Sequence, residues 1–467
     1  MSTRKGLSRR DLLRSSALFT GSLVLAGCVS TPAPAATSAP PAEATAAEAT
    51  AAPTAAPAAG EKATIRWQDW PDWEPKMDQL MNLIATELPD INVEFEPLGE
   101  GFEDKTLAMM VAGTAPDVIT GWGPVFRKWA EKGQLLDLQP FVDRDLSPEQ
   151  LADFHKWQWD GMVDRVTKIR FAVPYYINLI MLYYNKQAFD EEGVPYPDKD
   201  MDRAGYTEML MRMTKKEGDK VVRWGGSQPI WYDRIMIIVQ AYGGHFVNPD
   251  DWTECWLGKQ EAQDALEWLR ARMWDDNSVA QPLQLEGIGQ ATGTEAGPWA
   301  AGMLATQEDG MGAIMFYVNE SKFDWALTHL PPGAARRATL GTTDGWAVYK
   351  GTKQPEACWK FLQFLTGDKF QPFIMEAWGG IPCRASLLPK WKDTVTGAYP
   401  VLAKANLDAV LECLEMGYPM LTEEFKKQGE SEAAINAAME KVFQVGDTPV
   451  SYLKEVAEEV TKINREE

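Results

Sequence analysis

The sequence predicts an α/β fold with a doubly wound sheet. Strand-like and helix-like patterns alternate from residue 63 onward, which is typical of βαβ units. With 467 residues, 45% of them hydrophobic, the chain exceeds one ordinary core and suggests about two domains. The 46 Lys and Arg against 67 Asp and Glu give a net charge of −21, which argues against a nucleic-acid partner because phosphate binding needs clustered cations.

The N-terminus has the pattern of an export signal. Arg9 and Arg10 precede an apolar run at residues 17–27, which is too short to cross a bilayer core of about 30 Å. The arginine pair and its neighbours resemble a twin-arginine signal, although general secretion stays open as the route. The small residues before Cys28 resemble a lipoprotein box, in which this cysteine is lipidated and becomes the mature N-terminus. Residues 1–27 are therefore predicted to be a signal peptide.

Residues 28–60 are predicted to be a disordered linker behind the lipidated cysteine. Ala, Pro and Thr dominate this segment, and it contains no aromatic residue. It cannot bury enough apolar surface to offset the entropy of ordering, and its prolines interrupt any helix. The protein is thus expected outside the cytoplasm, at the cell surface or in the periplasm, and attached to the membrane through its lipid alone.

The folded body is predicted to begin near Ala63. Apolar residues recur at helical spacing in 76–87, whereas 91–96 alternates apolar and acidic residues as a half-buried strand does. The elements expected in order are a strand at 64–67, a helix at 76–87, a strand at 91–96, a helix at 104–112, a strand at 117–119, strands at 327–330 and 346–349, a helix at 355–365 and a mostly helical region at 399–463. Ligands of such sheets collect at the carboxyl ends of strands.

The loop after the first strand holds the densest group of candidate ligand-binding residues. Trp67, Asp69, Trp70 and Trp73 suit a carbohydrate, because an indole face stacks on the C–H face of a sugar and a carboxylate accepts hydrogen bonds from its hydroxyls. The alternative is that some of these rings pack in the core.

Further candidates combine rings, carboxylates or glycines in predicted loops. They are Asp117, Trp122, Tyr175, Tyr176, Trp231, Tyr232, Trp299, Asp344, Trp346 and Gly380. A structural role is the alternative for each kind: cap or turn chemistry for the two Asp, and core or hinge packing for the rings.

A series of short motifs follows in a fixed order from about residue 63 to 390. They are Ala112–Ile119, Gly133–Leu138, Val173–Tyr176, Leu182–Lys186, Gly302–Ala305, His329–Gly333, Glu356–Leu362 and Gly379–Pro382. Together they resemble family 1 of the extracellular solute-binding proteins of ABC transporters, which contains maltose-binding proteins. The resemblance implies a periplasmic-binding-protein fold, in which two α/β lobes enclose a ligand cleft.

The same resemblance implies where the lobes begin and end. Strands would cross between the lobes near 172–174, 306–310 and 380–383. Lobe 1 would then comprise 61–172 and 311–380, and lobe 2 would comprise 173–310 and 381–467.

The function that the resemblance implies is capture of a sugar or oligosaccharide and its delivery to an ABC permease by hinge closure. Such a receptor is expected to be a monomer without cofactor, metal or catalytic residue. A sugar is favoured over an amino acid because the candidates are aromatic and acidic, with no obvious Arg to clamp a carboxylate. A glycerol phosphate ester or other polyol in the same fold is one alternative.

A surface-anchored glycan-active enzyme is the other alternative. The chain has carboxylates and aromatic residues enough for a glycosidase, but no pattern selects an acid–nucleophile pair. It has no Gly-x-Ser-x-Gly, P-loop, HExxH or CxxC motif, and only three His. Cys255, Cys358, Cys383 and Cys413 leave one or two disulfides open, with no pairing selected.

Overall fold

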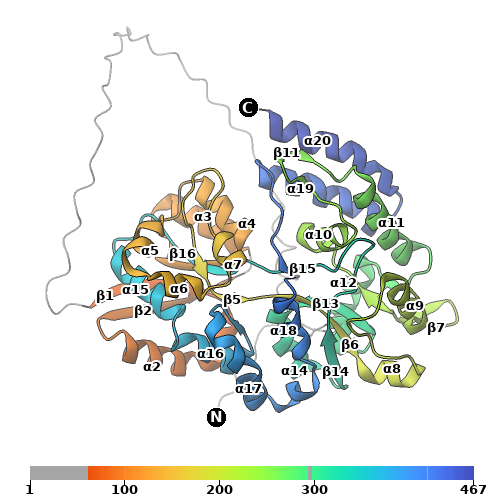
Figure 1. The fold of residues 1–467 in the computed structure, drawn as a ribbon, viewed down its shortest axis with the longest axis horizontal. Coiled ribbons are helices and arrows are strands. Elements are labelled where there is room, and N and C mark those ends of the chain that lie inside the picture. Colours follow the sequence, from red (N-terminus) through yellow and green to blue (C-terminus); the bar gives the residue numbers. More distant parts are fainter. Residues whose placement is uncertain (1–61, 100, 293–296, 418, 467) are drawn as a thin grey trace, which may run out of the picture. The chain divides into compact units, whose positions relative to one another are not determined.

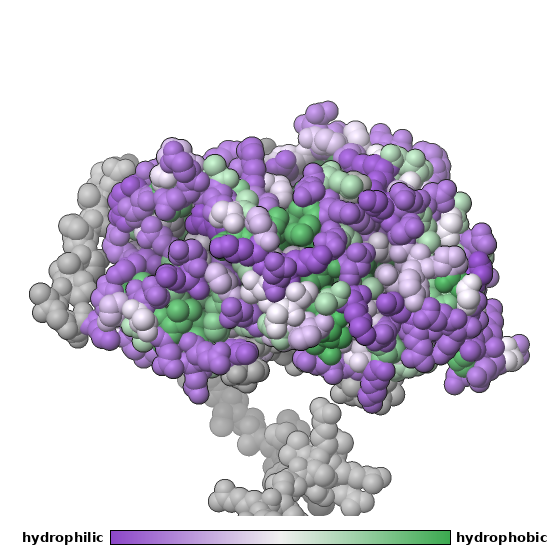
Figure 2. All heavy atoms as spheres, turned by 60° about the horizontal axis from the view of Figure 1, so that its bottom comes forward, coloured by the Kyte–Doolittle hydropathy of each residue, from purple (hydrophilic) through white to green (hydrophobic). Residues whose placement is uncertain are grey.

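The computed structural model describes residues 62–99, 101–292, 297–417 and 419–466. Arg9, Arg10, Cys28 and the predicted linker lie outside these ranges. Within them, no helix is both long and apolar enough to cross a membrane. The face drawn in Figure 2 is largely hydrophilic, and its hydrophobic residues form small separate patches.

A five-stranded sheet organises the first lobe, in the order β2-β1-β3-β16-β4. Its strands are β1 (Ala63–Asp69), β2 (Ile91–Pro97), β3 (Val118–Gly121), β16 (Gly345–Val348) and β4 (Val173–Pro174). β1 is parallel to β2 and β3, whereas β16 is antiparallel to β3 and β4. The strands predicted around residues 65, 93, 118 and 347 are confirmed.

Helices surround this sheet in Figure 1 and bury its apolar side chains. They are α2 (Met77–Glu87), α3 (Phe102–Ala112), α4 (Gly123–Glu131), α5 (Gln139–Asp145), α6 (Pro148–Ala152), α7 (Lys156–Asp160), α15 (Pro355–Leu365) and α16 (Phe370–Trp378). α3 ends where Gly113 adopts a left-handed backbone with φ of 75°, which favours glycine. The predicted helix at 355–365 is confirmed at both ends.

The second lobe has an antiparallel three-stranded sheet at its centre, in the order β13-β6-β14. Its strands are β6 (Ile180–Asn185), β13 (Thr306–Gly310) and β14 (Trp325–Thr328). Every residue of β6 is buried, as expected for its apolar run from Ile180 to Tyr184, and the buried Asn185 side chain accepts from the Ala188 backbone N–H at the start of the next helix. The main helices of this lobe are α8 (Lys186–Glu192), α9 (Arg203–Met213), α10 (Tyr232–Ala241), α11 (Gln260–Trp274), α12 (Pro282–Thr292), α14 (Ile314–Glu320), α17 (Leu388–Ala398), α18 (Asp408–Glu415), α19 (Gln428–Met439) and α20 (Leu453–Arg465).

The chain passes between the two hydrophobic cores at three places. Tyr176 packs in the core of lobe 1 and Ile177 in that of lobe 2, and the same change occurs between Ile374 and Met375. The third passage follows Leu340. Two short strand pairs accompany these passages: β5 (Tyr176–Ile177) with β17 (Ile381–Pro382), and β15 (Thr339–Leu340) with β18 (Pro419–Met420).

The crossing expected at 306–310 is wrong. β13 and β14 both pair with β6, and Met311 and Ile314 pack in a core of lobe 2. Residues 311–340 therefore stay with lobe 2, and the chain returns to lobe 1 through 341–344. The expectation came from the resemblance alone, whereas the place of β13 follows from its long-range pairing with β6.

The four cysteines of the folded body are free thiols, and all are buried. Burial raises the pKa of each to about 12, so that all four stay protonated near neutral pH. Each behaves as a small apolar side chain.

Candidate functional site

A cavity of about 400 Å³ lies between the two lobes, and we call it the central pocket. Lobe 1 contributes Trp70 after β1 and Trp122 after β3, and the 341–344 passage contributes Thr342 and Asp344. Lobe 2 contributes residues 231–234, at the start of α10. The pocket thus lies at the carboxyl ends of two strands of the five-stranded sheet, where α/β sheets bind ligands.

Three further cavities share lining residues with the central pocket. One of about 520 Å³ shares Trp70 and Tyr176 with it, and we call this one the aromatic chamber. Another, of about 620 Å³ in lobe 2, shares Trp231 and Arg234. The last, of about 450 Å³, shares Thr343 and Thr422, and we call it the polar end.

Two indoles form the wall of the central pocket on lobe 1. The rings of Trp70 and Trp122 lie 6.2 Å apart and within 14° of parallel, and Phe102 contacts both edge-on at 5.7 Å. Gly123 permits the close approach behind them, because a Cβ there would lie 2.3 Å from the Thr343 hydroxyl. This wall offers ring surface held in place by its neighbours.

The opposite wall carries Trp231, whose side chain is 63% exposed. This residue is the N-cap of α10, and its extended backbone turns the indole out of the helix. Tyr232 follows it but is buried, and its hydroxyl donates to the Glu423 carbonyl at 2.7 Å. Trp231 is therefore the exposed ring on this side of the pocket.

Several polar groups of the central pocket have no hydrogen-bond partner among the described residues. They include Oδ2 of Asp344, Oγ1 of Thr342, and Nε and Nη1 of Arg234. Asp344 is only 7% exposed, and burial raises its pKa to about 7 although the charge of Arg234 opposes the shift. Buried polar groups need partners, so this pocket suits a ligand with several hydroxyl groups.

Sequence reasoning missed Arg234, although a signal was present. Trp231 and Arg234 are three residues apart at the start of a helix, and residues at this spacing lie on one face. An indole predicted at the pocket should therefore have pointed to the guanidinium beside it.

Three candidates from the first loop and from β16 are core side chains instead. Trp67, Asp69 and Trp346 are completely buried. Asp69 accepts hydrogen bonds from the Trp346 indole and from the backbone N–H of Trp70, both at 2.7 Å. Burial raises the pKa of Asp69 to about 7. The carboxylate binds the surrounding indoles and has no free face for a ligand.

Other candidates also have structural partners. Trp299 is completely buried, and its indole donates to the Ser321 hydroxyl at 2.9 Å. Asp117 accepts from the Arg66 backbone N–H at 2.9 Å and from the Thr352 hydroxyl at 2.6 Å, which ties β1 to the turn after β16. The polar groups of Trp299 and Asp117 are thus engaged by partners within the fold.

The remaining candidates lie at or beside the passages between lobes. Trp73 and Tyr175 are almost fully buried and line the aromatic chamber, and Tyr176 lines both the chamber and the central pocket. Gly380 is a packing glycine, because a Cβ there would lie 2.3 Å from a methyl carbon of Ile374.

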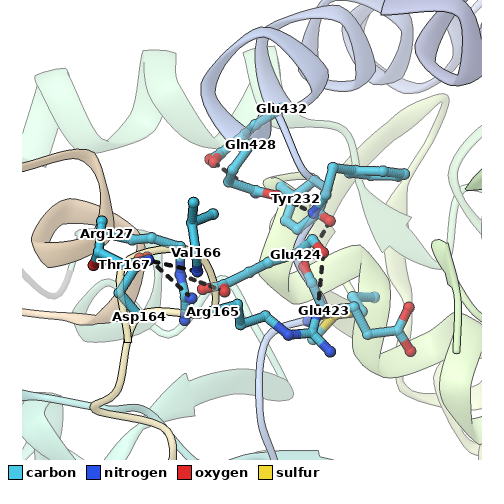
Figure 3. A network of polar contacts seen from close by, with 12 residues as sticks. Arg127, Asp164, Arg165, Val166, Thr167, Tyr232, Glu423, Glu424, Gln428 and Glu432 are labelled. Carbon is cyan, nitrogen blue, oxygen red and sulfur yellow. Dashed lines mark hydrogen bonds and ion pairs between the residues drawn. The ribbon is translucent and has the colours of Figure 1, made fainter. Parts of the chain in front are cut away.

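Charged residues of both lobes meet at the polar end (Figure 3). Arg127 of α4 forms an ion pair with Glu424, which precedes α19, and lies 3.9 Å from the Asp164 carboxylate. All three side chains are less than 10% exposed. Burial raises the pKa of Glu424, and the charge of Arg127 opposes that shift. A buried ion pair therefore links the lobes here.

Glu423, the residue before Glu424, is held by hydrogen bonds within lobe 2. Glu423 accepts hydrogen bonds from the Gln240 amide and the Phe246 backbone, both at 2.7 Å, and from the Val247 backbone at 3.0 Å. Its carboxylate also lies 2.6 Å from Nδ1 of His245. Within the described ranges, no three His, Cys, Asp or Glu side chains are grouped as metal ligands would be.

Comparison with known proteins extends this description. A family model described as bacterial extracellular solute-binding protein matches residues 70–372. The chain is also 25% identical over 276 residues to the maltodextrin-binding protein MdxE of Bacillus subtilis strain 168. That match covers 55% of this chain and 58% of the relative, little more than half the relative's length.

Solved structures share the fold at low sequence identity. An ABC substrate-binding protein from Listeria monocytogenes in complex with cycloalternan has a TM-score of 0.74 at 22% identity, over 86% of this chain and 99% of that one. The MalE maltose/maltodextrin-binding domain of Bdellovibrio bacteriovorus, bound to maltotriose, has a TM-score of 0.67 at 17% identity, over 86% and 99% of the two chains. These likenesses confirm the two-lobed α/β fold.

Proposed function

Because the chain belongs to the bacterial extracellular solute-binding protein family, we propose that it captures a sugar or oligosaccharide for an ABC importer. The ligand would bind in the central pocket and be delivered to the permease, and the protein would act as a monomer. It would bind without cofactor and without catalysis. The relatives that carry maltotriose and cycloalternan support a carbohydrate ligand.

One observation carries this proposal. Unpartnered groups of Asp344 and Arg234 line the same pocket, between indoles of lobe 1 and the indole of Trp231. A sugar has hydroxyls that donate to a carboxylate and accept from a guanidinium, while its C–H face covers an indole. An amino acid would leave most of these rings without a partner.

The ligand would act on the position of the lobes through the passages that it contacts. Thr342 and Asp344 lie in the 341–344 passage, so a ligand bound to them and to α10 favours the closed form over the open one. X-ray scattering should show a smaller radius of gyration at saturating ligand. An unchanged profile despite proven binding would contradict closure.

A panel of compounds tests the assignment by thermal shift. It should contain maltose, maltotriose, mannotriose, tagatose and cycloalternan, with glycerol 3-phosphate and free amino acids for comparison. We expect the melting temperature to rise with at least one sugar, because a ligand that binds only the folded state stabilises it. A shift with phosphate esters alone would reject the sugar, and turnover of a glycan would reject the receptor.

Arg234 is the observation that keeps a phosphate ester or other polyol as the second candidate. Its guanidinium lines the central pocket and has unpartnered donors. The carboxylates of Asp233, Asp344 and Glu432 line the same pocket, however, and they would repel a phosphate dianion. This charge balance favours the neutral sugar.

We also propose that lipid on Cys28 holds the protein at the membrane. In this arrangement Arg9 and Arg10 belong to a signal peptide that is removed. Cys28→Ser should abolish lipidation, since the variant has no sulfur to carry the lipid. Metabolic labelling with a fatty-acid analogue measures this, and label retained by the variant would contradict the anchor.

A further inference from the structure

The aromatic chamber differs in chemistry from the central pocket that it adjoins. Seven aromatic side chains line it, contributed by the loop after β1, the first passage, α14, α16 and Tyr399. Among the lining side chains that the structure describes, Lys76 and Asn319 are the polar non-aromatic ones, and none of those described is a carboxylate. In the central pocket, by contrast, Asp233, Asp344 and Glu432 are lining residues.

The polar tip of one chamber ring is already engaged within the protein. The Tyr399 hydroxyl lies within hydrogen-bond distance of the backbone carbonyls of Glu376 and Ala377. This residue therefore presents ring carbon to the chamber while its donor serves the fold.

The rings also brace one another. Trp378 contacts Tyr176 edge-on at 4.7 Å and Tyr175 at 6.0 Å, and Trp73 lies nearly parallel to Tyr175 at 6.4 Å. Packed rings change position at a cost, so the chamber is a preformed apolar surface. Its volume of about 520 Å³ lies in the range of small-molecule sites.

A sugar ring has fewer polar partners in this chamber than in the central pocket. Its C–H face stacks on an indole in either place, but here its hydroxyls would leave water for Lys76, Asn319 and the donors of the rings, among the described lining side chains. An apolar ring loses nothing of this kind, and it gains from leaving water and from edge and face contacts with indoles.

We propose that the ligand is a glycoside whose apolar aryl group occupies the aromatic chamber while its sugar lies in the central pocket. Trp70 and Tyr176 belong to both cavities, so one molecule can extend from one into the other. The inference rests on the proposed function, because it names the class of sugar derivative that the same cleft takes.

Matched glycosides test this on the full-length protein. Calorimetry should compare the methyl and 4-nitrophenyl glycosides of glucose, mannose and maltose. For whichever sugar binds, we expect the 4-nitrophenyl glycoside to bind about 10- to 100-fold more tightly, the gain expected for burying one aromatic ring. Equal affinities of the two glycosides would overturn the proposal. So would an equal gain from maltose to maltotriose, which would assign the chamber to a sugar ring.

A pair of variants at Phe316 tests where the aryl group binds. This residue lines the chamber but not the central pocket. Phe316→Gln places a polar amide in the chamber and should remove most of the aryl gain, while the methyl glycoside binds as before. Phe316→Leu keeps the surface apolar and should retain most of the gain. Loss of the gain in both variants or in neither would contradict the assignment.

A sugar-free experiment separates failure of this proposal from failure of the proposed function. If neither these glycosides nor any sugar of the thermal-shift panel binds, the sugar assignment fails, and 4-nitrobenzyl alcohol then tests the chamber alone through quenching of tryptophan fluorescence. Saturable quenching that Phe316→Gln weakens would support an aryl site. Quenching that does not saturate, or that the substitution leaves unchanged, would overturn it.

Discussion

The two ends of the gap between the lobes differ in how their charged groups are paired. At the polar end, Arg127, Asp164 and Glu424 of the two lobes are buried against one another. In the central pocket, the buried Oδ2 of Asp344 and donors of Arg234 have no hydrogen-bond partner among the described residues. The first arrangement holds an ion pair without a ligand, although Nη1 of Arg127 and Oδ1 of Asp164 also have no hydrogen-bond partner among the described residues. We expect the groups of the second to find their partners in a ligand.

This difference distinguishes a ligand site from a contact between the lobes. From residue composition alone, either role could be assigned to either end. Arg, Asp and Glu occur in each, so the residue types do not distinguish a ligand site from a contact between lobes. Pairing distinguishes them. The Arg127–Glu424 ion pair across the gap stabilises a particular arrangement of the lobes, while unpartnered groups beside the exposed Trp231 indole select a ligand.

The largest effect is expected from breaking the contact at the polar end. Arg127→Ala leaves the buried carboxylates of Glu424 and Asp164 without their cation, and should lower the free energy of unfolding by about 3–5 kcal/mol. Chemical denaturation measures the loss. Lys128→Ala is the matched control, since the next residue of α4 pairs with Asp104 in solvent and its loss should change stability little. Equal effects of the two substitutions would contradict the buried contact.

The next effect concerns the wall of the central pocket. Trp231→Ala should weaken sugar binding by about 2–4 kcal/mol, the range for a ring that anchors a ligand, and should leave the unliganded melt unchanged because this indole is 63% exposed. Trp299→Ala is the contrasting variant. Its completely buried ring should cost about 3–5 kcal/mol of stability.

These two variants are compared by calorimetry and melting of the same samples. A lower melting temperature of Trp231→Ala, together with unchanged sugar affinity of the protein folded at low temperature, would contradict this prediction. Trp231 would then stabilise the fold and would not contact the ligand in the central pocket.

A smaller effect should follow the ionisation of Asp344. Ligand hydroxyls donate to its carboxylate, so binding favours the ionised form, whose pKa is about 7. Sugar affinity should fall about tenfold as the pH decreases from 8 to 6. Unfolding does not explain such a loss, because a carboxyl whose pKa is raised in the folded state adds stability as the pH falls toward 4.

The control for this prediction is Asp344→Asn, which keeps the side-chain shape and removes the titration. Its affinity should be weaker at pH 8 and nearly constant between pH 6 and 8. Asp69 and Glu308, whose pKa values are also raised to about 7, remain in the variant. If the affinity of Asp344→Asn still depends on pH, the titrating group would therefore be Asp69 or Glu308 and not Asp344.

Sequence patterns were sufficient for the elements at 64–119 and 346–365, since alternation and helical spacing depend on local burial, but they predicted none of the elements between 120 and 310. They were insufficient to predict which side chains at the end of β1 are buried and which line the pocket. Trp67 and Asp69 share one face of β1 and are buried, while Trp70 lies just beyond the strand and lines the pocket. Trp67, Trp70 and Trp73 cannot be told apart by their sequence context. Only the pairing of β1 with its neighbouring strands decides which of these rings lie in the core and which line the cleft.

Two further differences have the same origin. The resemblance implied a crossing at 306–310, but β13 pairs with β6 inside lobe 2. Glu424 and Arg127 are nearly 300 positions apart, and nothing local in either segment indicates their contact. Long-range pairing decides both, and it is not contained in periodicity or motif spacing.

A crystal structure with the sugar that raises the melting temperature most tests the central claim directly. We predict a sugar hydroxyl within hydrogen-bond distance of Oδ2 of Asp344 and a sugar face against the Trp231 indole, with the Arg127–Glu424 pair intact. A sugar bound at the polar end instead, with that ion pair broken and Asp344 still unpartnered, would contradict it.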